Sequence, residues 1–250
     1  GEYSANMLRE AILGEELKLD APAAAPGRPP ILCPGCPHRS VYYVLNKLKM
    51  HAAGDIGCYT LGNAMPLDMV DTCLCMGAGL NIAQGVEKVE PDTTCFAFVG
   101  DSTFFASAIT GVVNAVYNQA NMVLVVLDNS TTAMTGHQPH PGTGRTVMGE
   151  IVQKINIEQV LRGIGVTEIE TINPLELEAS VSCVKRMAEK SGVRAIIFKA
   201  PCIAVTKPKA PLHVDQDSCI GCKKCIRDLG CPAIVMNDGK ICIDASMCTG

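Results

Sequence analysis

The chain has 250 residues, of which 48 % are hydrophobic and 18 % charged, with a formal net charge of −4. This length allows one or two domains at about 150 residues each, and the composition excludes a disordered chain. The slightly acidic balance argues against a basic nucleic-acid surface. The longest apolar run, Met122 to Leu127, is far shorter than the roughly 18 residues of a membrane-spanning helix.

Cysteine is the unusual residue, with 14 in the chain. Disulfide-rich secreted scaffolds are much shorter, and the first residues lack the basic and apolar regions of a signal peptide. We therefore expect a cytoplasmic protein with reduced thiols that bind a metal or cluster. The chain begins with Gly1 and ends at Gly250 inside a cysteine motif, so we expect it to be part of a longer protein.

The predicted elements begin with a helix over 2–19, followed by a Pro- and Ala-rich linker over 21–30. Apolar strands then alternate with helical stretches. Strands are expected at 95–99, 122–127 and 194–199, and helices at 103–118, 157–163 and 174–191. Continuous apolar strands separated by helices predict an α/β fold, a parallel sheet with helices on both faces.

Two polar pairs follow neighbouring strands of this sheet. Gly100-Asp101 ends one strand and opens a helix, and Asp128-Asn129 ends the next strand. Ligands of parallel sheets bind outside the carboxyl ends of the strands. Carboxylate and amide oxygens suit Mg²⁺, and the N–H groups of a helix N-terminus suit phosphates. Gly-Asp alone is also common in plain turns, but the whole arrangement is typical of thiamine-diphosphate enzymes.

The strongest motif is a run of cysteines near the C-terminus. Cys219, Cys222 and Cys225 are followed by Cys231-Pro232, which is typical of bacterial ferredoxins with [4Fe–4S] clusters. The spacing from Cys225 to Cys231 is longer than usual. Because the fourth cysteine of such a run ligates the other cluster in two-cluster ferredoxins, we expect Cys231 to serve a second cluster together with Cys248. A structural zinc site is the alternative, but zinc prefers two separated cysteine pairs.

A resemblance to a known family rests on several of these segments. The opening Cys33-Pro34-Gly35-Cys36-Pro37-His38, the segment 55–59, the polar pairs and Thr135-Gly136-His137-Gln138 resemble the 2-oxoacid:ferredoxin oxidoreductases, and most closely the large subunit of the indolepyruvate type. The resemblance implies three parts. These are a helix and linker over 1–28, a thiamine-diphosphate-binding domain over 29–206, and a truncated ferredoxin-like [4Fe–4S] domain over 207–250.

The resemblance also implies roles for individual residues. Mg²⁺ would be bound by the side chains of Asp101 and Asn129 and by the carbonyl of Thr131. Other residues implied at the cofactor are Cys36, His38, Gly77, Gly100, Ser102, Thr135 and Gly136. Ser102 departs from the usual Gly-Asp-Gly. The acid that activates the cofactor is expected from another domain, so no catalytic residue is assigned.

The implied activity is oxidative decarboxylation of arylpyruvates such as indolepyruvate to acyl-CoA and CO₂. Electrons would pass through [4Fe–4S] clusters to ferredoxin, and a small β subunit would complete an oligomer. Another 2-oxoacid such as pyruvate is an alternative substrate. A non-oxidative thiamine decarboxylase would not need the cysteine run. An electron-transfer subunit on a non-catalytic α/β scaffold would not need the Asp101 and Asn129 pair.

Several remaining residues have simpler interpretations. Cys33 and Cys36 could be a thioredoxin-like redox pair, but a cofactor-pocket or structural role fits the rest of the chain better. Four cysteines in apolar contexts are expected to be buried, namely Cys73, Cys95, Cys183 and Cys202. Cys242 is expected to be a packing residue. His137 and His140 share an apparent surface loop, where histidines usually have no special role, although a neighbouring diphosphate would favour one for His137.

Overall fold

The structure is a computed structural model that describes residues 3–14, 27 and 29–250, and the chain divides into two compact units, Gly1–Pro30 and Ile31–Gly250. The first unit contains α1 (Ala5–Leu13), which Gly14 ends in a left-handed conformation. The rest of the helix expected over 2–19, and most of the expected linker, lie outside the described residues. Within the described ranges, no helix is long and apolar enough to cross a membrane.

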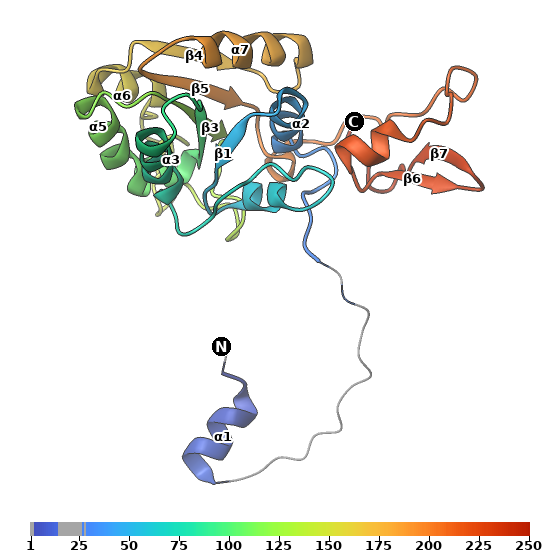
Figure 1. The fold of residues 1–250 in the computed structure, drawn as a ribbon. Helices are drawn as coiled ribbons and strands as arrows, with labels where there is room; N and C mark the ends of the chain where they lie inside the picture. Colours follow the sequence, from blue (N-terminus) through green and yellow to red (C-terminus); the bar gives the residue numbers. More distant parts are fainter. Residues whose placement is uncertain (1–2, 15–26, 28) are drawn as a thin grey trace. The chain divides into compact units, whose positions relative to one another are not determined.

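A five-stranded parallel sheet forms the centre of the second unit, with the strand order β1-β2-β3-β5-β4 (Figure 1). Its strands are β1 (His51–Ala53), β2 (Cys95–Gly100), β3 (Met122–Asp128), β4 (Glu168–Ile172) and β5 (Val193–Lys199). All side chains of β2 and β3 are buried, as continuous apolar strands in a covered sheet require. The predicted parallel α/β sheet is therefore confirmed.

Helices cover both faces of the sheet. They are α2 (His38–Leu48), α3 (Ala78–Val89), α5 (Ile109–Tyr117), α6 (Ile157–Ile164) and α7 (Leu177–Glu189). Side chains of α2 and α7 pack against Phe96 and Phe98 on one face, whereas α3, α5 and α6 pack against Ala97 and Val99 on the other. Successive residues of a strand point to opposite faces, so β2 contributes to both cores.

The chain is continuously helical after β2, but not uniformly so. The short helix α4 (Asp101–Thr103) continues as a π-helical turn, Phe104–Ala108, before α5 begins. Such turns occur often at functional sites. There are also two 3₁₀ turns. Cys58–Asn63 lies between β1 and α3, and Ile203–Val205 follows β5.

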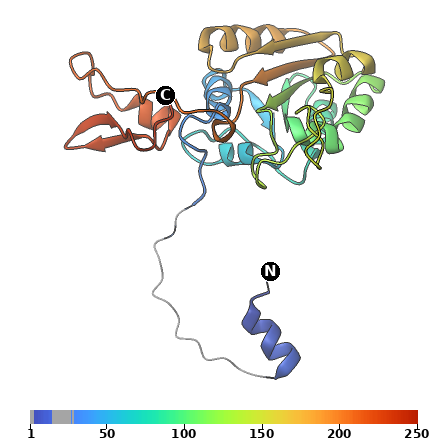
Figure 2. The same cartoon turned by 180° about the vertical axis from the view of Figure 1, so that it is seen from behind.

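The C-terminal cysteine-rich segment has little regular structure. It contains a π-helical turn, Cys225–Leu229, and an antiparallel hairpin of β6 (Ile234–Asn237) and β7 (Lys240–Ile243) (Figure 2). Its buried apolar side chains are few, and Ala233 and Ile241 are the most deeply buried. A segment with so small a core needs a further source of stability, such as a bound metal or cluster.

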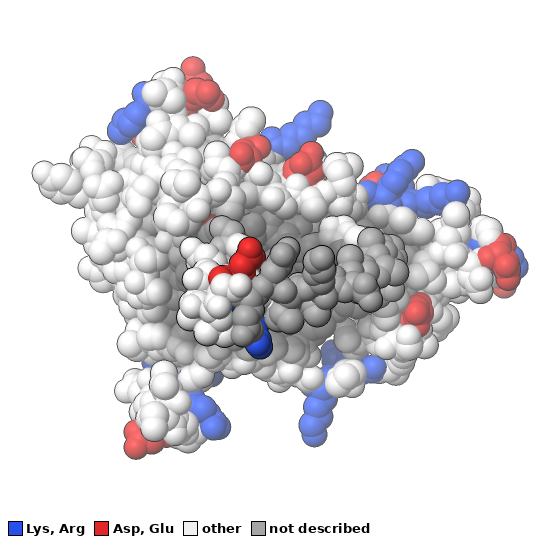
Figure 3. Space-filling view, turned by 90° about the horizontal axis from the view of Figure 1, so that it is seen from below, with Lys and Arg blue, Asp and Glu red and all other residues white. Residues whose placement is uncertain are grey.

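Charged side chains do not form a block of one sign on the face in Figure 3. Blue lysine and arginine atoms and red aspartate and glutamate atoms are scattered over it, and most of the visible surface is uncharged. This mixture agrees with the small net charge of −4.

Candidate functional site

Asp101 lies at the carboxyl end of β2 and reaches across to the chain that leaves β3. The two strands are parallel neighbours, with Gly100 paired to Leu127. Asp101 Oδ1 accepts a hydrogen bond from the N–H of Ser102 at 2.9 Å, and Oδ2 accepts one from the N–H of Ser130 at 2.8 Å. The carboxylate is almost fully buried, so it is held in one orientation.

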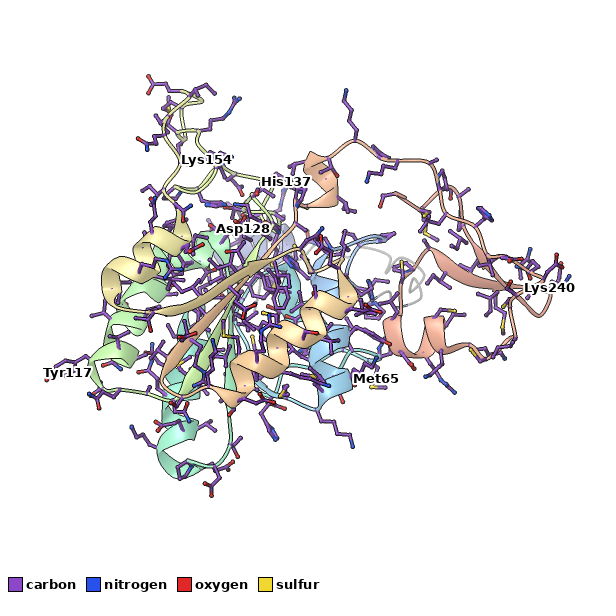
Figure 4. All side chains as sticks on the ribbon, turned by 90° about the horizontal axis from the view of Figure 1, so that it is seen from above. Met65, Tyr117, Asp128, His137, Lys154 and Lys240 are labelled. Atoms are coloured by element: carbon purple, nitrogen blue, oxygen red, sulfur yellow. The ribbon has the colours of Figure 1, made fainter. Side chains whose placement is uncertain are left out.

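His140 completes the surroundings of this carboxylate. Its Nε2 lies 3.1 Å from Asp101 Oδ2, and both side chains are 4 % exposed. Burial raises the pKa of Asp101, and the hydrogen bond from His140 acts in the opposite direction. The expectation that the loop histidines are exposed is therefore wrong for His140, whereas His137 is exposed. Figure 4 shows the loop that carries His137 and Lys154 near Asp128, at the end of β3.

Asn129 is fixed by α2 and by its own turn. Its Nδ2 lies 3.3 Å from Nε2 of His38, the first residue of α2, and its Oδ1 accepts the N–H of Thr131 at 3.2 Å. Burial lowers the pKa of His38 to about 4, so the ring is neutral at pH 7. A neutral Nε2 that lacks a proton can accept the amide N–H of Asn129.

A buried network around Tyr59 supports the same edge of the sheet. The Tyr59 hydroxyl donates to Asp55 Oδ2 at 2.6 Å and accepts the N–H of Gly100 at 2.9 Å. Asp55 Oδ1 accepts the N–H of Gly77 at 2.7 Å. A Cβ added at Gly100 would lie 2.7 Å from the Tyr59 ring, so only glycine fits at this position without moving that ring. Asp55 and Tyr59 belong to the segment that carried the family resemblance, but their mutual contact could not be predicted from it.

A pocket opens at this edge. Its lining includes Gly100, Asp101, Ser102, Asn129, Thr131 and Thr135, all of which the family resemblance implied at the cofactor. Cys58, Tyr59 and Met76 line it as well. Of the other residues expected there, His38 contacts Asn129 without lining the pocket, Gly77 contacts Asp55, and neither Cys36 nor Gly136 is part of the lining.

The donor set fits Mg²⁺ with a diphosphate. Mg²⁺ uses one or two carboxylates, with carbonyls, water and phosphate oxygens completing its shell. The Asp101 carboxylate, the Asn129 amide and the Thr131 carbonyl supply this chemistry at one wall of the pocket. Within residues 3–14, 27 and 29–250, no group of three His, Cys, Asp or Glu side chains is arranged to hold a single ion. A site completed by phosphates does not need such a group.

The cysteines expected to bind iron lie in the C-terminal segment. Cys222 and Cys225 are exposed, and Cys219, Cys231 and Cys248 are half-buried. Cys225 begins the π-helical turn, and the Sγ of Cys248 accepts the N–H of Leu212 at 3.5 Å.

A second group of cysteines lies beside the pocket, and only part of it was considered from the sequence. The pKa of Cys58 is raised by burial and by the nearby thiols of Cys202 and Cys33. Burial, together with the thiols of Cys33 and Cys58, raises the pKa of Cys36 to about 12. The N–H of Cys202 also donates to the carbonyl of Asn129 at 2.9 Å. We call Cys33, Cys36, Cys58 and Cys202 the inner cysteine group.

Other cysteine expectations have mixed outcomes. Cys95 and Cys183 are buried as expected. The expectation was wrong for Cys73, which is exposed, and Cys202 is half-buried. Cys242 is half-buried in β7, opposite Val235.

Comparison with known families identifies the class. Residues 55–198 match the thiamine pyrophosphate enzyme family at its C-terminal TPP binding domain. This match includes the β2 and β3 ends and most of the sheet, so the chain belongs to this family of thiamine pyrophosphate enzymes.

Two curated relatives show which members of this family the chain is similar to. The chain is 40 % identical over 252 residues to indolepyruvate oxidoreductase subunit IorA of Archaeoglobus fulgidus, a match of 96 % of this chain and 40 % of that protein. It is 41 % identical over 266 residues to the subunit of the same name from Methanothermobacter thermautotrophicus, a match of 100 % of this chain and 43 % of that protein. The resemblance expected from the motifs is thus confirmed. The chain spans about two fifths of the length of these relatives.

A solved structure shares the fold. It is a 2-oxoglutarate:ferredoxin oxidoreductase from Magnetococcus marinus, with a TM-score of 0.61 and 20 % identity over 72 % of this chain and 67 % of that one.

Proposed function

We propose that this chain carries the thiamine-diphosphate site of a 2-oxoacid:ferredoxin oxidoreductase that acts on arylpyruvates such as indolepyruvate. The products would be acyl-CoA and CO₂, and ferredoxin would receive the electrons in the cytoplasm. The observation that carries the proposal is the pocket at the ends of β2 and β3, which Asp101 and Asn129 both line. The names of the relatives support the choice of substrate.

Different residues of the pocket would contact different parts of the cofactor. Asp101, Asn129 and the Thr131 carbonyl would hold Mg²⁺, and Ser102 at the start of α4 would face the diphosphate. Neutral His38 and buried His140 keep the two ligand side chains oriented, as outer partners of metal ligands commonly do. Bound thiamine diphosphate supplies the electron sink for decarboxylation.

We further propose that the chain holds iron–sulfur clusters in two places. The C-terminal segment would use Cys219, Cys222, Cys225, Cys231 and Cys248. The inner cysteine group would hold a [4Fe–4S] cluster of its own, because Cys33 and Cys36 share one turn, Cys58 lines the pocket, and the thiols of Cys33 and Cys202 act on that of Cys58. Four thiolates are the usual ligands of such a cluster. Clusters held by these two groups of thiols would supply one-electron carriers to the pocket.

The test uses the full-length protein with its small partner subunit, purified anaerobically. Iron, acid-labile sulfide and thiamine diphosphate are measured per chain, for the parent and for Asp101→Asn. Exposed Asp92 provides the control Asp92→Asn. We expect stoichiometric thiamine in the parent and the control, and binding weakened by more than about tenfold in Asp101→Asn.

The second part of the test addresses the substrate. Coenzyme A-dependent dye reduction is compared for indolepyruvate, phenylpyruvate, pyruvate and 2-oxoglutarate. A preference for the aryl substrates supports the proposal, and a preference for pyruvate would overturn the substrate assignment. Iron without thiamine, even after Mg²⁺ and thiamine diphosphate are added, would instead indicate an electron-transfer subunit on an α/β scaffold.

A further inference from the structure

Arg39 connects two segments that are far apart in the sequence. It lies in the first turn of α2 and is 5 % exposed. Its Nη2 donates to the carbonyl of Leu32 at 2.6 Å, with the carbonyl of Cys33 at 3.5 Å. Its Nη1 donates to the carbonyls of Leu229 and Gly230, each at 2.9 Å. One guanidinium therefore binds the backbone just before Cys33 and just before Cys231.

The thiols themselves are also near this guanidinium. Burial lowers the pKa of Arg39, and the charges of Cys231, Cys36 and Cys33 act in the opposite direction. The Nε of Arg39 is buried and has no hydrogen-bond partner in the described part of the chain. A buried positive charge that is only partly satisfied by carbonyls is stabilised by nearby anionic ligands such as thiolates.

The geometry requires an arginine. A guanidinium presents donors in a planar fork and can bind carbonyls on two sides at once, whereas a lysine is a single flexible point charge. The C-terminal segment is also packed closely at this position. Gly230 has a left-handed backbone with φ +59°, and an added Cβ would lie 2.5 Å from Cδ of Pro66. The carbonyls that Arg39 binds are therefore held in fixed positions.

We propose that Arg39 is a positioning residue that fixes the C-terminal cysteine segment against the inner cysteine group and so sets the separation of the clusters that the two groups would hold. The inference rests on the proposed function, because it assumes that both groups hold clusters. Since net charge near a cluster is one determinant of its reduction potential, the buried charge of Arg39 would also raise the potential of a cluster held by either group.

The first test needs no cluster. Hydrogen exchange of the amides at 225–235 is measured in the full-length protein as isolated anaerobically with its partner subunit, for the parent, Arg39→Met and Arg39→Lys. Arg227 lies in the same segment with its side chain 67 % exposed, so Arg227→Met is the matched control. We expect exchange about tenfold faster or more in Arg39→Met, because hydrogen bonds to a charged group are lost. Arg39→Lys should also be faster, and Arg227→Met should equal the parent.

The second test uses the cluster-loaded protein with its partner subunit. The potentials of the clusters and the magnetic coupling between them are measured by electron paramagnetic resonance. In Arg39→Met we expect lower potentials and weaker coupling. In Arg39→Lys, which keeps the charge, we expect weaker coupling with potentials closer to the parent.

The outcomes separate the two proposals. If Arg39→Met fails to fold, Arg39→Lys carries both comparisons. Parent-like exchange and coupling in the Arg39 variants would overturn the positioning role, even in a protein that holds both clusters. A parent protein without iron would overturn the cluster assignment, and the hydrogen-exchange result would still decide whether Arg39 fixes the segment.

Discussion

His140 and Asp101 form a buried pair, with Nε2 of the histidine 3.1 Å from Oδ2 of the aspartate. The histidine comes from the loop after β3, 39 residues further along the chain. The pair therefore makes the orientation of the proposed metal ligand depend on the folding of a long loop. Ligating carboxylates commonly depend on such outer partners.

We predict that His140→Leu weakens Mg²⁺-dependent binding of thiamine diphosphate by about 10- to 100-fold. The free energy of unfolding of the variant should also fall by about 1–3 kcal/mol, because the buried carboxylate loses a partner. Titration calorimetry and thermal unfolding provide the measurements. The control is His137→Leu, since His137 is an exposed residue of the same loop. Equal binding by the two variants would contradict a role for His140.

A second prediction concerns the Tyr59 hydroxyl. Tyr59→Phe leaves Asp55, which is fully buried, with one fewer hydrogen-bond donor, and it leaves the N–H of Gly100 without its acceptor. We expect the free energy of unfolding to fall by about 1–3 kcal/mol. Tyr117 is 84 % exposed, so Tyr117→Phe should leave stability within about 0.5 kcal/mol of the parent. Chemical denaturation of both variants tests this, and a similar small change in both would show that the network contributes little.

The strands that sequence analysis predicted well are those buried on both faces. The expected strands 95–99 and 122–127 are observed as Cys95–Gly100 and Met122–Asp128. They were predictable because every residue before the last one in each strand is apolar. Strand β1, with three residues, is too short to give a pattern. Strand β4 is an edge strand in which two glutamates and a threonine interrupt two isoleucines. Its polar positions hid it from a search for continuous apolar runs.

The candidate site was predictable for a similar reason. Asp101 and Asn129 follow adjacent parallel strands, so topology alone brings them to one edge. The roles of His140 and Tyr59 depend on contacts over 39 and 41 residues. Such contacts arise from loops without periodicity, so no local pattern indicates them. The inner cysteine group was missed for the same reason, since Cys58 and Cys202 meet only in the folded chain.

A third prediction compares two glycines. A Cβ at Gly100 would lie 2.7 Å from the Tyr59 ring, so Gly100→Ala should lower the free energy of unfolding by about 1–3 kcal/mol. Gly163 lies within α6 and has no atom within 4 Å of an added Cβ. Gly163→Ala should therefore raise stability by about 0.5–1 kcal/mol, because alanine favours the helix. Opposite shifts in the denaturation midpoint are the expected result, and destabilisation by both would show that the space at Gly163 is not free.

The last prediction concerns an ion pair between β4 and α7. Arg186 donates to Glu170 from Nε at 3.2 Å and from Nη2 at 2.5 Å. The hydrogen bonds from Arg186 lower the pKa of Glu170. A carboxyl whose pKa is lower in the folded than in the unfolded state stabilises the fold above its unfolded pKa, near 4.5. That contribution is lost as the pH falls through the folded pKa.

Glu170→Gln should therefore lower the free energy of unfolding by up to about 1 kcal/mol at pH 7, because the Glu170 side chain is 29 % exposed. The difference from the parent should disappear near pH 3, where the parent loses the same interaction by protonation. Urea unfolding at several pH values measures this difference. Exposed Glu150 provides the control Glu150→Gln, for which we expect no such dependence. A difference that stays constant from pH 7 to pH 3 would show that Glu170 acts through packing and not through its charge.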